Sequence, residues 1–248
     1  MKILKYPIYI IWRLWFYSWV IGTIIVAFPL LLIITAREQW YPIFFKIARA
    51  WANTILFIMG FKKKVVALQK IVPNKSYMFC ANHTSMIDIM LMLSVVKNPF
   101  VFVGKAELAK LPIFGFFYKR TCILVDRSDS ESRKAVFNEA QRRVKTGLGV
   151  CIFPEGLVPE DESIVLSPFK NGAFILAIEH QIPIVPITFY DCKKRFSYTF
   201  FSGSPGMLRV KVHPFIETKG LHIDDKRSVN ERMFETIYQE LIDDKQGV

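Results

Sequence analysis

The chain has 248 residues, a hydrophobic content of 52%, a mean hydropathy of +0.28 and a formal net charge of +12. This length suits one catalytic domain with a short accessory segment, and the apolar content is high for a soluble enzyme but too low for a polytopic transporter. The positive balance favours anionic partners such as phospholipid headgroups, phosphorylated substrates or acidic carrier proteins; nucleic acid is not expected, because zinc-ligand spacing, an RNP-type motif and a continuous basic helix are all missing.

The N-terminal segment is the most apolar part of the chain. Arg13 and Pro29 are the main interruptions between Ile8 and Ile34, and the run from Leu14 onward carries no charge. About 20 helical residues cross a bilayer core of roughly 30 Å, so this run can form a membrane helix with a kink at the proline. A buried helix pair is one alternative. A cleaved signal peptide is another, but the run is too long and no small-x-small site follows it cleanly.

A second apolar stretch runs from Trp40 to Phe61 and carries Lys46 and Arg49. This pattern suits a helix that lies in the membrane interface or folds back against the first. All five tryptophans of the chain lie in these two stretches, which fits anchoring at headgroup level. We therefore predict a membrane-anchoring helix pair at residues 1–61 and a catalytic domain at residues 62–248.

From Lys62 onward the pattern changes to alternating short strands and helices. Predicted strands cover residues 65–68, 77–81, 100–103, 122–125, 150–153, 184–189, 198–201 and 208–212, and predicted helices cover 84–96, 105–111, 129–145, 169–180 and about 230–243. Ser128 and Glu131 form a capping box for the third of these helices, which Gly147 ends. This alternation predicts an α/β domain with a largely parallel central sheet flanked by helices.

The four cysteines lie outside any CxxC pair, and three of them occur in apolar, strand-like runs. They are Cys80, Cys122, Cys151 and Cys192. Buried free thiols in a reducing compartment are the expected state, and neither a zinc site nor a disulfide framework is predicted.

The segment from Asn82 to Asp88 carries the sharpest chemical signal, because it begins where an apolar strand ends and a helix starts. On a continuous helix, His83 and Asp88 would point about 140° apart. They meet only if His83 lies in the preceding loop, where Thr84 or Ser85 can cap the helix. Asp88 would then fix the imidazole tautomer and leave the other nitrogen to accept a proton from a substrate hydroxyl. The helix start also offers N–H groups for an anion, whereas the alternative is a capped helix with a structural histidine.

Two further segments stand where α/β sheets place ligand sites. Phe153-Pro154-Glu155-Gly156 follows a predicted strand, and ligands bind beyond the carboxyl ends of such strands. Gly156 permits close approach of the backbone, and Glu155 can accept hydrogen bonds from hydroxyl groups, although an isolated tetrapeptide of this kind would be a tight turn. The strand at residues 182–188 is interrupted by prolines and by itself indicates only a core strand with an edge or bulge.

Taken in this order, the segments resemble the glycerolipid acyltransferase family, the group that contains 1-acylglycerol-3-phosphate acyltransferases. Asn82, His83 and Asp88 match its first motif, and residues 153–156 match the third in full. Residues 123–127 are similar to the second motif, a strand that ends in arginine, and residues 182–187 to the fourth. The resemblance covers roughly residues 75–190, and the N-terminal helix pair is similar to that of bacterial members.

The resemblance implies a membrane-bound acyltransferase of phospholipid biosynthesis. A fatty acyl group would move from acyl-ACP or acyl-CoA to the free hydroxyl of lysophosphatidic acid and give phosphatidic acid, on the cytoplasmic side of a bacterial inner membrane. His83 would be the general base and Asp88 would orient it, without a covalent enzyme intermediate. Neither a metal ion nor a cofactor is implied beyond the acyl carrier protein or coenzyme A of the donor.

The resemblance also implies residues that bind the acceptor. Glu155 and Gly156 would hold its glycerol portion, and Arg127 and Lys105 would bind its phosphate. For the last two, the residues themselves show only that they are cationic and stand at the ends of predicted strands.

The sequence departs from the family pattern directly after the third motif. The family commonly continues with Thr or Ser and then Arg, but Leu157 and Val158 stand here and residues 160–162 are acidic. The phosphate contact of that arginine is therefore absent, and Lys170 from the following helix is a candidate substitute. Acceptors such as a lyso-aminolipid or glycerol-3-phosphate thus stay open as alternatives.

Two other classes of protein are alternatives to an acyltransferase. A non-catalytic lipid-binding or membrane-scaffold protein of this fold would need His83 and Asp88 to be structural. A hydrolase would be expected to carry a Gly-x-Ser-x-Gly elbow, and the sequence has none.

Overall fold

A seven-stranded sheet forms the centre of the computed structural model, which describes residues 5–126, 129–159, 161 and 163–246. The strands are β1 (Phe61–Ala67), β2 (Met78–Ala81), β3 (Phe100–Lys105), β4 (Cys122–Val125), β5 (Gly149–Ile152), β6 (Ile184–Phe189) and β7 (Gly206–Val212). Their order across the sheet is β1-β7-β6-β2-β5-β3-β4, and every neighbouring pair is parallel except β6 with β7. The predicted α/β fold with a largely parallel sheet is confirmed.

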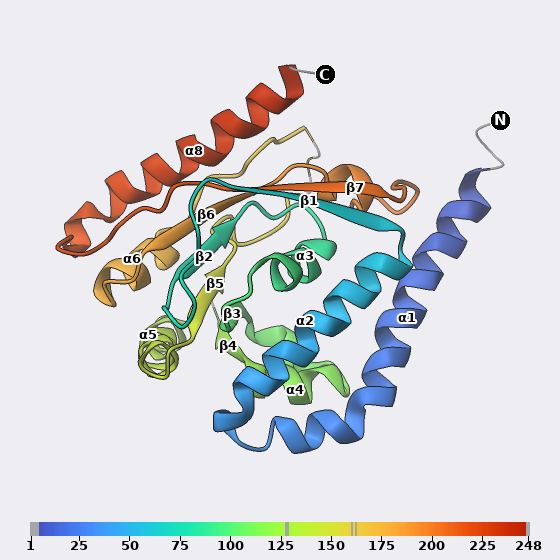
Figure 1. Cartoon of the computed structure of the whole chain (residues 1–248), viewed down its shortest axis with the longest axis horizontal. Coiled ribbons are helices and arrows are strands. Elements are labelled where there is room, and N and C mark those ends of the chain that lie inside the picture. Colours follow the sequence, from blue (N-terminus) through green and yellow to red (C-terminus); the bar gives the residue numbers. More distant parts are fainter. Residues whose placement is uncertain (1–4, 127–128, 160, 162, 247–248) are drawn as a thin grey trace.

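Helices cover both faces of this sheet (Figure 1). The α-helices are α1 (Lys5–Ile34), α2 (Tyr41–Ile58), α3 (Ile87–Val95), α4 (Phe114–Thr121), α5 (Ser130–Lys145), α6 (Gly172–Glu179), α7 (Cys192–Arg195) and α8 (Lys226–Gln246), and the 3₁₀ turns are η1 (Glu38–Trp40), η2 (Ala106–Lys110) and η3 (Ile223–Asp225). Helices α5, α6 and α8 lie on one face, and α2, α3 and α4 lie on the other with α1 outside them.

Burial of the strands follows their place in the sheet. Every residue of β2 and β6 is buried, as expected for parallel strands that are covered on both faces. Strand β1 lies at an edge and buries only its first residue; its three lysines at 62–64 discourage pairing with another chain. The tightly packed centre therefore holds the carboxyl ends of β2, β5 and β6 in fixed positions.

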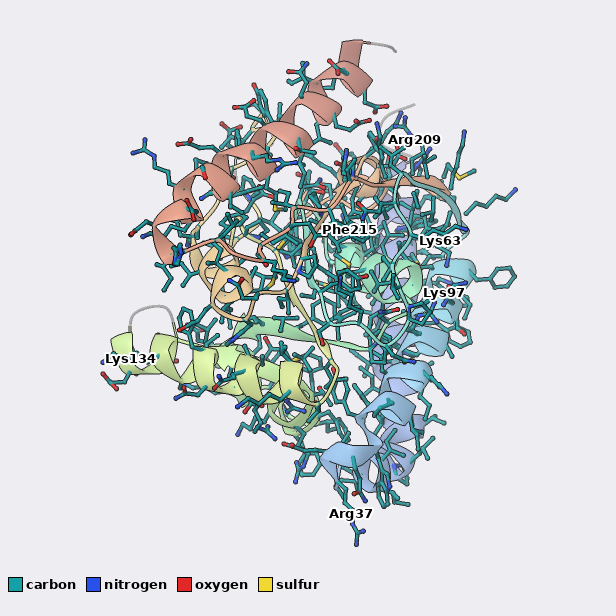
Figure 2. The ribbon with its side chains drawn as sticks, turned by 60° about the vertical axis from the view of Figure 1, so that its left-hand side comes forward. Arg37, Lys63, Lys97, Lys134, Arg209 and Phe215 are labelled. Atoms are coloured by element: carbon teal, nitrogen blue, oxygen red, sulfur yellow. The ribbon has the colours of Figure 1, made fainter. Side chains whose placement is uncertain are left out.

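The two N-terminal helices lie side by side, which confirms the fold-back arrangement predicted for the second apolar stretch. Helix α1 is long and apolar enough to cross a membrane, as judged by its length and composition, and much of its apolar surface is exposed. Arg37 stands at the turn that follows α1 and points away from the protein (Figure 2). Because α2 also packs against α3, the domain boundary after residue 61 stays a prediction.

Several local predictions need correction. Residues 198–201 form bends and turns, not a strand, and the helix expected from Thr84 begins at Ile87. Ser128 lies outside the described residues; the side chain of Asp129 caps α5 by accepting from the N–H groups of Glu131 and Ser132. Helices α4 and α7 were not predicted, because both are short and lack a clear apolar period.

The four cysteines are free thiols, as predicted, and all except the half-buried Cys122 are buried. Burial raises the pKa of Cys80 and Cys151, and it raises the pKa of Cys122 to about 12. Because the thiolate is the reactive form, we expect alkylation of the native protein at pH 8 to be about a thousandfold slower than that of an unperturbed thiol. Labelling before and after unfolding in denaturant measures this, and fast native labelling would contradict the burial.

Candidate active site

His83 and Asp88 meet at the carboxyl end of β2. His83 lies in the loop after the strand, Asp88 lies in the first turn of α3, and His83 Nδ1 is 2.9 Å from Asp88 Oδ2. The hydrogen bond places the proton on Nδ1, so Nε2 is the nitrogen with a lone pair. The Asp88 side chain is fully buried, whereas that of His83 is 18% exposed, so the imidazole can meet a substrate.

Asp88 Oδ2 also holds the backbone of the His83 loop. It accepts hydrogen bonds from the N–H groups of Thr84 at 2.7 Å and Ser85 at 2.8 Å. The predicted cap is present at Ser85, whose Oγ accepts from the N–H of Ile87 at 3.3 Å, and the Asp88 carboxylate inside the helix also caps the loop before it. These two N–H groups are not available to an anion, so that expectation from the sequence is wrong for them.

Asn82 fixes the start of this loop against the neighbouring strand. Its Nδ2 donates to the carbonyl oxygen of Phe189 at 2.9 Å, and its Oδ1 accepts from the N–H of Phe189 at 2.8 Å. The side chain thus continues the β2–β6 pairing by one step where the backbone of β2 turns away. Asn82 was identified from the sequence as part of a motif, but its partner could not be, because Phe189 lies 107 residues further along the chain.

Glu155 supports the same loop from the other side. Its Oε1 accepts from the N–H of His83 at 2.6 Å and its Oε2 from the N–H of Ser167 at 2.9 Å. The residue is buried, and burial raises the pKa of its carboxyl group, although the two N–H donors oppose this. Both oxygens are occupied by backbone donors, so the structure gives Glu155 a supporting contact to His83. Its predicted contact with an acceptor stays a prediction.

The turn that carries Glu155 also covers one face of the imidazole. The Phe153 ring stacks on His83 with centroids 4.3 Å apart and an interplanar angle of 19°. Gly156 adopts a φ of +82°, which favours glycine, and its N–H donates to the carbonyl of Phe153. Stacking and hydrogen bonding together restrict the ring to one orientation, with an edge open to solvent.

The structure does not bring the other predicted site residues that it describes into contact with the His83–Asp88 pair. Lys105 is exposed at the carboxyl end of β3, on the same edge of the sheet as His83 but two strands away. Arg127 lies outside the described residues. Lys170 is exposed, and its N–H donates to the carbonyl oxygen of Pro154. The roles assigned to all three in binding the acceptor stay predictions.

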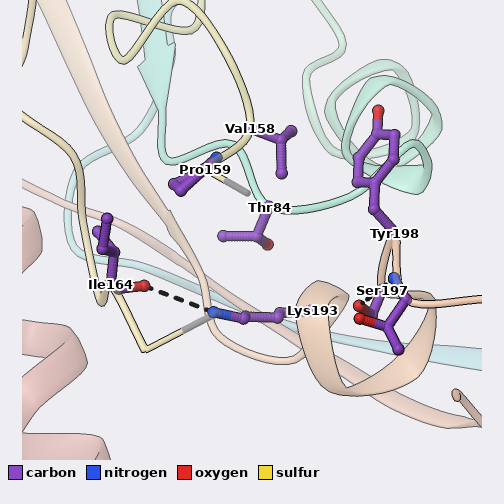
Figure 3. Close-up of a pocket in the computed structure, with 8 residues that line it drawn as sticks. Thr84, Val158, Pro159, Ile164, Lys193, Ser197 and Tyr198 are labelled. Carbon is purple, nitrogen blue, oxygen red and sulfur yellow. Dashed lines mark hydrogen bonds between the residues drawn. The ribbon is translucent and has the colours of Figure 1, made fainter. Parts of the chain in front are cut away.

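A cavity of about 240 Å³ lies beside the His83 loop. Its lining consists of Thr84, Val158, Pro159, Ile164, Lys193, Ser197, Tyr198 and Thr199. Figure 3 shows the Lys193 side chain extending from α7 toward Ile164, where its ammonium lies 3.4 Å from the carbonyl oxygen. Val158, which stands where the family commonly has arginine, lines the same cavity. Lys193 is therefore the cationic lining residue that sequence reasoning missed.

The cavity also has an acidic neighbour. Hydrogen bonds from Ser163 lower the pKa of Asp161, and the nearby charge of Lys193 lowers it further. A lysine with hydroxyl groups from Thr84, Ser197 and Thr199 around it suits a phosphate, whereas an aspartate close by would suit an amine. The charges around the cavity therefore determine which class of ligand its chemistry would favour.

Comparison with known proteins places the chain among acyltransferases. The Acyltransferase family model matches residues 62–190. Human 1-acyl-sn-glycerol-3-phosphate acyltransferase alpha is 30% identical over 212 residues, which are 82% of this chain and 72% of that protein. A probable 1-acyl-sn-glycerol-3-phosphate acyltransferase of Mycoplasma pneumoniae is 30% identical over 157 residues, 61% of this chain and 58% of that protein.

A solved structure has the same fold as this chain. The crystal structure of the 1-acyl-sn-glycerophosphate acyltransferase PlsC from Thermotoga maritima matches with a TM-score of 0.79 and 20% identity, covering 99% of this chain and 98% of that one. The likeness extends over the N-terminal helices as well as the sheet.

The contacts of Glu155 generate a test of its supporting role. In Glu155→Gln one carboxylate oxygen becomes an NH₂ group, which faces a backbone N–H and cannot accept from it. We expect a loss of about 1–3 kcal/mol in unfolding free energy and a fall in kcat, measured by denaturant titration and turnover. Glu131→Gln, at an exposed ion pair with Lys134, is the control and should change stability by less than about 0.5 kcal/mol. Unchanged stability and kcat with a raised acceptor KM would instead identify Glu155 as a substrate ligand only.

Proposed function

This chain belongs to the acyltransferase family, and we propose that it transfers a fatty acyl group from acyl-ACP or acyl-CoA to the free hydroxyl of 1-acylglycerol-3-phosphate. The observation that carries the proposal is the His83–Asp88 pair, in which a buried carboxylate orients a partly exposed imidazole. The names of the relatives support lysophosphatidic acid as the acceptor and phosphatidic acid as the product.

In the proposed reaction His83 acts on the substrate itself. Nε2 takes the proton of the acceptor hydroxyl while the oxygen attacks the thioester carbonyl carbon. The tetrahedral intermediate then expels the thiolate, which receives the proton from the imidazolium, so an ester forms and a thiol is released. Asp88 stabilises the transient imidazolium and keeps the ring in place.

The buried serine hydroxyl beside the pair is engaged elsewhere, which supports a substrate hydroxyl as the nucleophile. Ser85 is fully buried, and its Oγ donates to the backbone carbonyl oxygen of Phe196. The cysteine beside the pair is also unsuitable: burial raises the pKa of the Cys192 thiol well above its usual range, and the charge of Asp88 raises it further. These contacts support direct transfer without an acyl-enzyme.

The cationic side chains near the site have proposed roles in binding the acceptor. We assign Lys193 to the phosphate, since it lines the cavity next to the His83 loop, with Lys105 and Arg127 as the further cations that the family resemblance implies. Glu155 and Gly156 would approach the glycerol portion. The apolar α1 would keep the protein on the cytoplasmic face of a bacterial inner membrane, where lipid acceptor and carrier-bound donor meet.

The first test measures thioester-dependent acylation by the full-length protein in detergent. His83→Ala should lower kcat by about 10²-fold or more, because the general base is lost. His222→Ala, at the exposed histidine that caps the η3 turn, is the matched control, and its kcat should stay within about twofold of wild type. If wild type acylates lysophosphatidic acid with neither donor, the acceptor assignment is wrong, and glycerol-3-phosphate and lyso-aminolipids are compared next.

A second test addresses the phosphate contact. Lys193→Met keeps the length of the side chain but removes its charge, so the KM for lysophosphatidic acid should rise about tenfold, the effect of one charge-assisted hydrogen bond. Lys194→Met changes the adjacent, exposed lysine, which does not line the cavity, and should leave this KM unchanged. A lyso-aminolipid acceptor would reverse the pattern, because its binding would weaken on Asp161→Asn and not on Lys193→Met.

A further inference from the structure

The single charged residue in the apolar run of α1 does not face a membrane or solvent. Arg13 is 3% exposed and reaches the backbone of a segment nearly 190 residues away. Its Nη2 donates to the carbonyl oxygens of Ser197 at 2.5 Å, Thr199 at 2.8 Å and Ser202 at 3.4 Å, and its Nε donates to that of Phe200 at 3.1 Å. One guanidinium therefore gathers four carbonyl groups of one short segment.

Aromatic contacts reinforce this attachment. The Arg13 guanidinium lies 4.3 Å from the centroid of the Phe196 ring, and the fully buried ring of Phe16 lies 4.4 Å from the same ring. Near the start of α1, Tyr6 packs edge-on against Phe201 at 4.9 Å. Contacts at several successive turns thus fix α1 along the segment.

The segment that Arg13 holds forms one wall of the cavity beside His83. Ser197, Tyr198 and Thr199 line that cavity together with Thr84. The carbonyl of Phe196 accepts from Ser85, so the same segment also contacts the loop that carries the catalytic pair. Residues 197–205 form no helix or strand, so their backbone depends on side-chain contacts for its position.

The chemistry of arginine suits this task. Within the described part of the chain, no carboxylate forms an ion pair with Arg13, so backbone carbonyls, together with the hydroxyl of Tyr17, compensate for burying its charge. A guanidinium offers several donors in a rigid planar fork, whereas an ammonium concentrates its donors at one point. Burying this cation costs free energy, and in return its planar fork holds the carbonyl-rich segment in one conformation.

We propose that Arg13 is a positioning residue for acceptor binding, and that through it the N-terminal helix forms part of the acceptor pocket. The inference rests on the proposed function, since it assigns the cavity to the lyso-lipid acceptor. Tyr198, Phe200 and Phe201 are exposed beside α1, which gives the acyl chain of the acceptor an apolar surface between bilayer and cavity. Helix α1 is then both the membrane attachment and a structural support of the pocket.

The test compares full-length variants in detergent. Arg13→Met keeps the apolar stem but removes the fork, and Arg13→Lys keeps the charge with a single nitrogen. Arg49→Met is the matched control, because Arg49 also donates to two carbonyl oxygens, those of Leu93 and Ser94, but joins α2 to α3. For each variant we would measure the melting temperature, KM for lysophosphatidic acid, KM for the donor, and amide hydrogen exchange.

We expect Arg13→Met to raise the acceptor KM about tenfold or more, since a displaced pocket wall misplaces the substrate, and to leave the donor KM within about twofold. Amide exchange should accelerate in residues 196–204 specifically. Arg13→Lys should lie between Arg13→Met and wild type. Arg49→Met should lower the melting temperature and leave the acceptor KM and the exchange of residues 196–204 as in wild type.

Two results would overturn the inference. In the first, Arg13→Met resembles Arg49→Met, with a lower melting temperature but an unchanged acceptor KM. In the second, amide exchange rises throughout the protein and not specifically in residues 196–204. Failure of the wild type to acylate lysophosphatidic acid would refute the proposed function separately. The exchange measurement needs no substrate, so even then it decides whether Arg13 holds the cavity wall in place.

Discussion

A single carboxylate oxygen, Asp88 Oδ2, holds the geometry on which the rest of the site depends. It accepts from the imidazole of His83 and from the N–H groups of Thr84 and Ser85, so the loop and the ring are fixed by the same atom. These three donors offset part of the cost of burying this carboxylate, and losing any of them would leave the buried charge less well compensated. The His83–Asp88 pair and the local backbone therefore form together.

Neighbouring strands supply the remaining restraints. Asn82 ties the loop to the end of β6, and Glu155 ties it to the turn after β5. Because β5, β2 and β6 are adjacent and parallel, their carboxyl ends bring these three residues to one edge of the sheet, where α/β proteins place their ligand sites. The His83 loop is thus restrained from both sides, while Phe153 covers one face of the imidazole.

The sequence predicted those parts of the protein that depend on local pattern. The strand–loop–helix around His83 and the turn at Glu155 follow from apolar runs, spacing and a motif, and the parallel sheet follows from the alternation of elements. Arg13 and Lys193 could not be assigned in this way, because their partners are distant backbone carbonyls and an irregular segment that carries no periodic signal. The same irregularity explains the wrong strand at 198–201, where an aromatic run resembles a strand but the carbonyls bond to Arg13 instead of a neighbouring strand.

The edge strand β1 has a consequence for the order in which the chain can fold during its synthesis. Among the described residues, β1 pairs only with β7, whose first residue is made about 140 positions after the end of β1. When α1 and β1 leave the ribosome, both the strand that completes the sheet edge and the carbonyl groups that surround Arg13 are still untranslated. Such long-range contacts form late, so Arg13 stays hydrated and the apolar surface of α1 stays uncovered until then. Early engagement of α1 with a lipid surface would keep this apolar segment from aggregating until its partners arrive.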